Sequence, residues 1–185
     1  KAYAAAGSDA RMNGCELPVV INSGSGNQGL TVSVPLIIYA EREHLDKEKL
    51  YRALVISNLT AIHLKTEIGR LSAFCGAVSA GAACGAGLAY LKDASEEVMN
   101  HTIVNALAIT SGIICDGAKA SCAAKIAVSV EAGILGYDMY MNGQQFYGGD
   151  GIISKGIENT IHNIGVLGSQ GMASTDQEII KIMCE

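Results

Sequence analysis

The stretch from Leu71 to Leu91 contains no charged residue and consists mainly of Gly, Ala, Ser and Cys. It is long enough to span a bilayer, and Gly81 and Gly85 form a small-xxx-small pattern that is typical of close helix pairs. The stretch has few leucines, no aromatic belt and no flanking basic cluster, which membrane helices usually have. We therefore expect a fully buried helix at the centre of a helical bundle and no membrane insertion.

The composition agrees with helix packing. The chain has 185 residues, which suits one domain, and 49% of them are hydrophobic while only 5% are aromatic. With 22 glycines, the core must consist of small aliphatic side chains and close backbone contacts. The net charge is -5, and the basic residues are scattered, so no basic stripe is present to bind nucleic acid.

Apolar residues at helical spacing and capping residues predict a series of helices. The opening as far as Pro18 is expected to be irregular. Pro35 is expected to kink or break the first helix, because proline has no amide hydrogen to donate. The first expected helix begins near Asn27, the second runs from Asp46 to Gly69, and the third follows Cys75. The fourth runs from Asp93 or Ser95 to about Cys115, and the fifth runs from near Ser121 toward Tyr140. A short helix is expected over 157–164, and a terminal helix is expected to begin at 174–176. No strand–helix alternation is present, so the predicted fold class is all-α.

The segment from Gly24 to Gly29 matches G-x-G-x-x-G and follows the short apolar run 19–21. This pattern can mark a dinucleotide site, but Pro35 interrupts the following helix and a second helix replaces the expected second strand. We reject the dinucleotide interpretation. A glycine turn that opens onto a helix N-terminus still suits an anion, and a carboxylate would bind there as well as a phosphate.

Three cysteines, Cys75, Cys115 and Cys122, lie beside glycines or small residues where backbone can approach a bulky inorganic ligand. Two interpretations stay open from the residues alone. The first is an iron–sulfur cluster held by three thiolates, with one iron free to act as a Lewis acid. The second is three buried structural cysteines, since cysteine is commonly buried.

The other thiols are expected to be structural. Cys84 falls on the opposite helical face from Cys75, and Cys15 and Cys184 are expected to be ordinary free thiols. The six cysteines lie in apolar runs, which predicts a reducing, cytoplasmic compartment and no disulfide scaffold. No C-x-x-C pair or histidine cluster indicates a zinc site.

Five segments occur in order along the chain: Asp9–Met12, Ser23–Leu30, Phe74–Ala77, Ile114–Cys122 and Tyr147–Ile153. Together they resemble the C-terminal part of the iron–sulfur L-cysteine desulfidase family, which is related to the α chain of bacterial L-serine dehydratase. The resemblance extends over nearly the whole chain. In that family the last two of three cysteine ligands are separated by six residues in the desulfidase branch, as Cys115 and Cys122 are here.

The resemblance implies one helical iron–sulfur catalytic domain over residues 1–185, with a [4Fe-4S] cluster on Cys75, Cys115 and Cys122. It implies β-elimination from a small amino acid: L-cysteine to pyruvate, ammonia and sulfide, or L-serine to pyruvate and ammonia. The residues expected to bind the substrate form the turn Ser23, Gly24, Ser25, Gly26, Asn27 and Gln28.

The catalytic base is not identified by the sequence. The family's desulfidases have a further cysteine, thought to be the base, in an N-terminal region that this chain does not contain. His63 and His101 are base candidates by chemistry, but each lies within a helical pattern and is expected to be structural. An alternative is a non-catalytic helical fragment or subunit that needs a partner region for activity, and a homo-oligomer is a further option.

Overall fold

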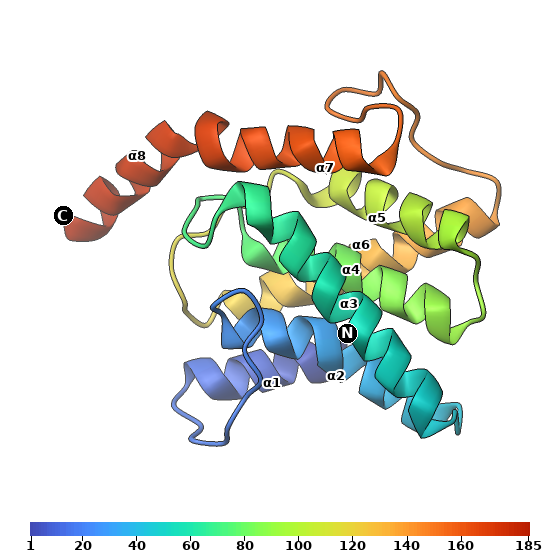
Figure 1. The fold of residues 1–185 in the computed structure, drawn as a ribbon. Coiled ribbons are helices and arrows are strands. Elements are labelled where there is room, and N and C mark those ends of the chain that lie inside the picture. Colours follow the sequence, from blue (N-terminus) through green and yellow to red (C-terminus); the bar gives the residue numbers. More distant parts are fainter.

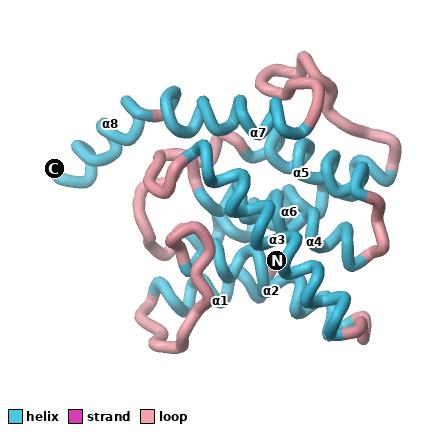
Figure 2. The backbone as a smooth tube through the Cα atoms, in the orientation of Figure 1, coloured by secondary structure: helices cyan, strands magenta, loops and turns pink.

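The computed structural model describes all residues 1–185 and contains helices and loops without a β-strand (Figure 2). The all-α prediction is therefore confirmed. The helices are α1 (Ala2–Met12), α2 (Gly26–Arg42), α3 (Lys47–Ile68), α4 (Gly76–Leu91), α5 (Glu96–Thr110), α6 (Cys122–Met141), α7 (Ile157–Val166), a π-helical turn η1 (Leu167–Gly171) and α8 (Ala173–Cys184).

Helix α4 forms the centre of the molecule, in contact with α2, α3, α5 and α6 (Figure 1). Every residue of α4 except Gly76 and Tyr90 is buried, as the uncharged sequence predicts. Its glycines let α6 approach closely: a Cβ at Gly133 of α6 would lie 2.4 Å from the carbonyl oxygen of Gly81. The small-xxx-small pattern therefore serves helix packing inside the protein. None of the helices is both long and apolar enough to cross a membrane.

Helix α3 has the boundaries that its capping residues predict. The carboxylate of Asp46 accepts a hydrogen bond from the backbone N–H of Glu48 at 2.9 Å, and Gly69 ends the helix with a φ of 87°. An N-cap carboxylate satisfies an amide that has no partner within the helix, and glycine adopts positive φ without strain.

Two expectations for the first forty residues are wrong. The opening is not irregular, because the alanine-rich segment from Ala2 forms α1, whose Ala4 and Ser8 are fully buried. Alanine has the highest helix propensity, and the packing of α1 against α2 and α6 adds stability. Of the two effects expected of Pro35, the break is wrong, because α2 continues through Pro35 to Arg42.

Helix α5 ends at Thr110, five residues before the predicted end at Cys115. Residues 111–121 leave the helix, and Ile114 forms an isolated antiparallel bridge with Phe74. At the other end of the chain, α7 packs against α3, and α8 extends away from the body with no buried residue (Figure 1).

Candidate functional site

The helical hairpin of α4 and α5 brings two distant cysteines together. Cys75 immediately precedes α4 and Cys115 follows α5, so antiparallel packing places them at the same end of the hairpin. The bridge then fixes them: the N–H of Cys115 donates to the carbonyl of Ala73 at 2.6 Å, and the N–H of Cys75 donates to Ile113 at 3.2 Å. These backbone bonds set the positions of both thiols.

Cys122 begins α6, at the end of a short loop that Lys125 holds in place. The ammonium of Lys125 donates to the carbonyl of Ile114 at 3.0 Å and forms an ion pair with Asp116 at 2.5 Å. The hydrogen bond from Lys125 lowers the pKa of Asp116 to about 2. The Cys122 thiol contacts the carbonyl oxygen of Gly117 at 3.7 Å, and Gly117 allows the turn with a φ of 93°.

The thiols of Cys75 and Cys115 influence each other's ionisation. The neighbouring Cys75 thiol, with further contributions from the backbone N–H of Gly117 and from Lys125, lowers the pKa of Cys115. The Cys115 thiol and burial raise the pKa of Cys75. Loss of one proton from this pair of thiols is therefore favoured, and the thiolate is the form that binds metals.

Several hydrogen bonds hold the glycine turn before α2. Asn22 and Ser25 exchange two backbone hydrogen bonds, and the Asn22 side chain donates to Asn58 of α3 at 3.0 Å. The Oγ of Ser25 caps α2 by accepting from the N–H of Gln28 at 3.3 Å. Gly29 is required, because a Cβ there would lie 1.7 Å from the carbonyl oxygen of Val20.

The turn and the three cysteines line one cavity of about 200 Å³. Of the residues expected to bind metal or substrate, only Gly26 is not among the lining residues. The charged side chains that line it, Lys65, Arg70 and Lys125, are all basic, and no Asp or Glu lines it. An electropositive cavity of this kind favours anionic ligands.

The two amides of the turn differ in their contacts. The side chain of Asn27 already accepts a hydrogen bond from Arg11 at 3.1 Å and contacts the sulfur of Met12 at 3.7 Å. The carboxamide of Gln28 makes no hydrogen bond, and its Oε1 is buried. Gln28 therefore has more capacity than Asn27 to bind a ligand, although sequence reasoning treated the two alike.

Lys65 is the functional candidate that sequence reasoning missed. Its side chain lines the cavity, yet the residue is only 5% exposed and forms no ion pair. Burial lowers the pKa of its ammonium. A signal was present in the sequence, because Lys65 lies on the same helical face as Ala61 and Ile68, both of which are buried.

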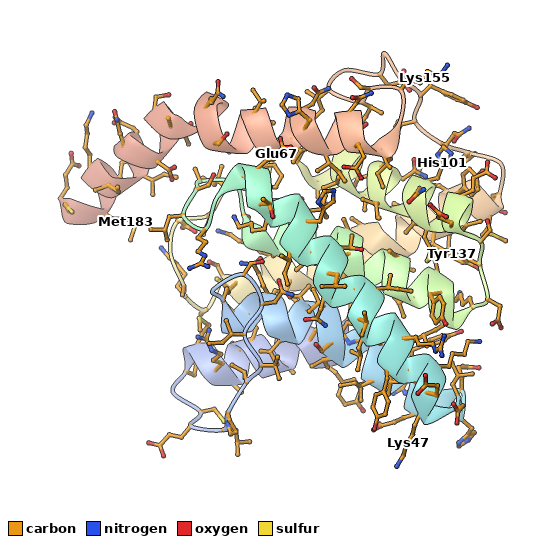
Figure 3. All side chains as sticks on the ribbon, viewed as in Figure 1. Lys47, Glu67, His101, Tyr137, Lys155 and Met183 are labelled. Atoms are coloured by element: carbon orange, nitrogen blue, oxygen red, sulfur yellow. The ribbon has the colours of Figure 1, made fainter.

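Other candidate residues lie away from the cavity. Cys84 is completely buried in α4, whereas Cys15 and Cys184 are exposed, and none of these lines the cavity. His63 is exposed and paired with Glu158 at 2.8 Å. His101 stacks on Tyr140 and lies near Lys155, at the other end of the molecule from Met183 (Figure 3).

No group of three or more His, Cys, Asp or Glu side chains is close enough together to hold a single metal ion. The fold consists of helices, and thiols and basic side chains line its cavity. The model of the serine dehydratase alpha chain family matches residues 1–181, and the chain belongs to that family.

The relatives include UPF0597 proteins of three bacteria. The chain is 68% identical over 183 residues to that of Desulfitobacterium hafniense, covering 99% of this chain and 43% of the relative. It is 58% identical to the protein of Lachnoclostridium phytofermentans, and the match covers 99% of this chain and 44% of that relative. It is 55% identical to the protein of Finegoldia magna, and the match covers 100% of this chain and 44% of that relative. The chain thus spans less than half the length of these relatives. No solved structure matches it.

Proposed function

We propose that residues 1–185 are the iron–sulfur catalytic domain of an L-cysteine desulfidase. The observation that carries this proposal is the shared cavity, which is lined by Cys75, Cys115 and Cys122 and by the turn before α2. Membership of the serine dehydratase alpha chain family supports a lyase acting on a small amino acid. The six-residue separation of Cys115 and Cys122 favours cysteine over serine as the substrate.

The donor set of the cavity suits a [4Fe-4S] cluster on Cys75, Cys115 and Cys122. In a cluster each thiolate binds a different iron, so its sulfurs stand further apart than those around a single ion. Lys65, Arg70 and Lys125 offset the negative charge of the thiolates. When bound, the cluster would supply a Lewis acid for the leaving sulfur.

The chain's own residues bind and orient the amino acid. The first turn of α2 presents free backbone amides, which suit the substrate carboxylate. Loss of the α-proton and of hydrogen sulfide ion leaves aminoacrylate, which takes up water and gives pyruvate and ammonia. We assign the base that removes the α-proton to the part of the full-length protein that lies outside residues 1–185.

The experiment is anaerobic purification of the full-length protein with measurement of iron, acid-labile sulfide and visible absorption. Cys75→Ala, Cys115→Ala and Cys122→Ala are each expected to abolish the visible absorption and the release of sulfide from L-cysteine. Cys15→Ala is the matched control, because Cys15 is exposed and lies outside the cavity. Full iron content in Cys122→Ala would contradict the proposal that Cys122 is one of the three cluster ligands.

A non-catalytic role for residues 1–185 is the alternative. Release of sulfide and pyruvate is therefore assayed for the full-length protein, for residues 1–185 alone, and with L-serine in place of L-cysteine. A full-length protein that holds a cluster but consumes neither amino acid would favour the alternative.

A further inference from the structure

Lys65 is a buried residue whose ammonium has no partner in the chain. It lies in the last turn of α3, is 5% exposed, and its ammonium makes no hydrogen bond or ion pair. Buried lysines are normally paired, because desolvation of an ammonium is costly. An unpaired ammonium that lines a cavity therefore points to an anionic ligand that binds beside it.

The other cations of the cavity are less suited to this role. Lys125 is already bound to Asp116 and to the carbonyl of Ile114. Arg70 is exposed at the mouth, where water weakens its interactions. Lys65 also lines a neighbouring hollow together with Ser23 and Gly24, so the residue lies beside the turn that precedes α2.

Gln28 supplies a second unsatisfied group in the same cavity. The residue is 6% exposed, and its buried Oε1 accepts no hydrogen bond. Its carboxamide lies against Gly76, where a Cβ would be 2.5 Å from Nε2, so the absence of a side chain at Gly76 leaves room for it in the cavity. A buried acceptor without a donor is costly, and a cationic donor is the partner that satisfies it best.

We propose that Lys65 binds the α-carboxylate of the substrate and that Gln28 accepts a hydrogen bond from its α-ammonium. This assignment rests on the proposed function and deepens it, because the two groups together recognise an α-amino acid as opposed to a simple thiol or amine. Both are positioning residues that hold the amino acid relative to the three cysteines. The competing role for Lys65 is to balance the charge of the thiolates alone.

The test uses the full-length, cluster-loaded protein and L-alanine, which has both charged groups but no leaving group. Binding is measured by calorimetry for the wild type, Lys65→Met, Gln28→Leu and the control Lys47→Met, whose lysine is exposed at the other end of α3 (Figure 3). Lys65→Met and Gln28→Leu are each expected to weaken binding about tenfold or more, as for a lost charge-assisted hydrogen bond. Lys47→Met is expected to bind like the wild type.

A second measurement separates carboxylate binding from other roles. The ratio of the dissociation constant of ethylamine, which lacks the carboxylate of L-alanine, to that of L-alanine is expected to fall about tenfold or more in Lys65→Met. Lys65→Arg, which keeps the charge, is expected to retain part of this preference for L-alanine. Gln28→Leu is expected to raise the dissociation constants of both compounds, since both have the amine.

The outcomes distinguish this assignment from the proposed function. Wild-type protein that does not bind L-alanine, or Lys65→Met protein that binds it unchanged, overturns the assignment even if sulfide is released normally. Loss of iron in Lys65→Met with unchanged binding of L-alanine would show that Lys65 serves the cluster, and this result also overturns the assignment. Absence of a cluster and of turnover in the wild type contradicts the proposed function, whereas the calorimetric result for L-alanine remains interpretable without turnover.

Discussion

The carboxamide of Gln28 lies directly against the backbone of Gly76, so that a Cβ at Gly76 would be 2.5 Å from Nε2 and 2.6 Å from the carboxamide carbon. This contact joins the start of α2 to the start of α4, one residue after Cys75. Only glycine at this position allows Gln28 to occupy its place in the cavity.

Gly76→Ala is therefore expected to displace the side chain of Gln28 and to raise KM for L-cysteine, with iron content retained. The measurement is steady-state kinetics of the full-length protein together with iron analysis. Gly112→Ala is a matched control, because a Cβ at Gly112 would meet nothing within 4 Å. Equal KM values for the two variants would contradict the role given to this contact.

Gly133→Ala is expected to destabilise the fold strongly. Its new Cβ would lie 2.4 Å from the carbonyl oxygen of Gly81, so α4 and α6 must separate. Overpacking of this kind lowers the free energy of unfolding by about 2 to 3 kcal/mol. Gly7→Ala, whose Cβ would make an ordinary 3.5 Å contact with Leu30, is expected to raise it by about 0.5 to 1 kcal/mol. Urea denaturation checks both, and similar midpoints would be inconsistent with the close crossing.

Cys84 is expected to resist alkylation in the native protein. Burial raises the pKa of its thiol to about 12, so it remains protonated at pH 8 and also out of reach of the reagent. Cys15 is exposed and is expected to react with iodoacetamide at once. Mass spectrometry of peptides before and after unfolding measures the difference. Rapid labelling of Cys84 without unfolding would contradict its burial.

Lys65→Met is expected to raise the melting temperature of the ligand-free protein by several degrees. The substitution replaces an unpaired, partly desolvated ammonium with an apolar side chain of similar length, which removes a desolvation cost. Lys47→Met, at an exposed position, is expected to leave it unchanged. A lower melting temperature for Lys65→Met would mean that its ammonium has a partner.

Lys125→Met is expected to reduce iron retention by loosening the loop between Cys115 and Cys122. It removes the hydrogen bond to Ile114 and the ion pair with Asp116. Lys119→Met removes only a longer contact with Asp116, at 3.2 Å, and is expected to have a smaller effect. Iron content after gel filtration with a chelator compares the two, and equal losses would argue against the anchoring role of Lys125.

Much of the fold follows from local sequence signals. Asp46 and Gly69 mark the ends of α3, and the absence of charge from Leu71 to Leu91 marks the buried position of α4. These features depend on capping and on periodicity, which act over a few residues. The prediction of an irregular opening is wrong because the alanine-rich segment of α1 has a high helix propensity.

The remaining features depend on contacts between distant residues. Helix α5 ends at Thr110, where Gly112 is a local stop signal, but the pairing of Ile114 with Phe74 that follows this end has no local signal. Leu59 and Ile62 belong to the helical apolar pattern yet are 60% and 46% exposed, because periodicity does not reveal which faces are covered. The unpaired state of Lys65 likewise becomes visible only when the surrounding elements are in place.

The bridge between Phe74 and Ile114 closes the open end of the α4–α5 hairpin, whose connecting turn lies at the opposite end. Any ligand that binds both Cys75 and Cys115 in the folded state therefore adds a second connection at this end of the hairpin and stabilises the hairpin by mass action. The affinity for the ligand and the stability of the hairpin are therefore thermodynamically linked. A substitution in the turn after Leu91, far from either thiol, that destabilises the hairpin is expected to lower the affinity for the ligand as well.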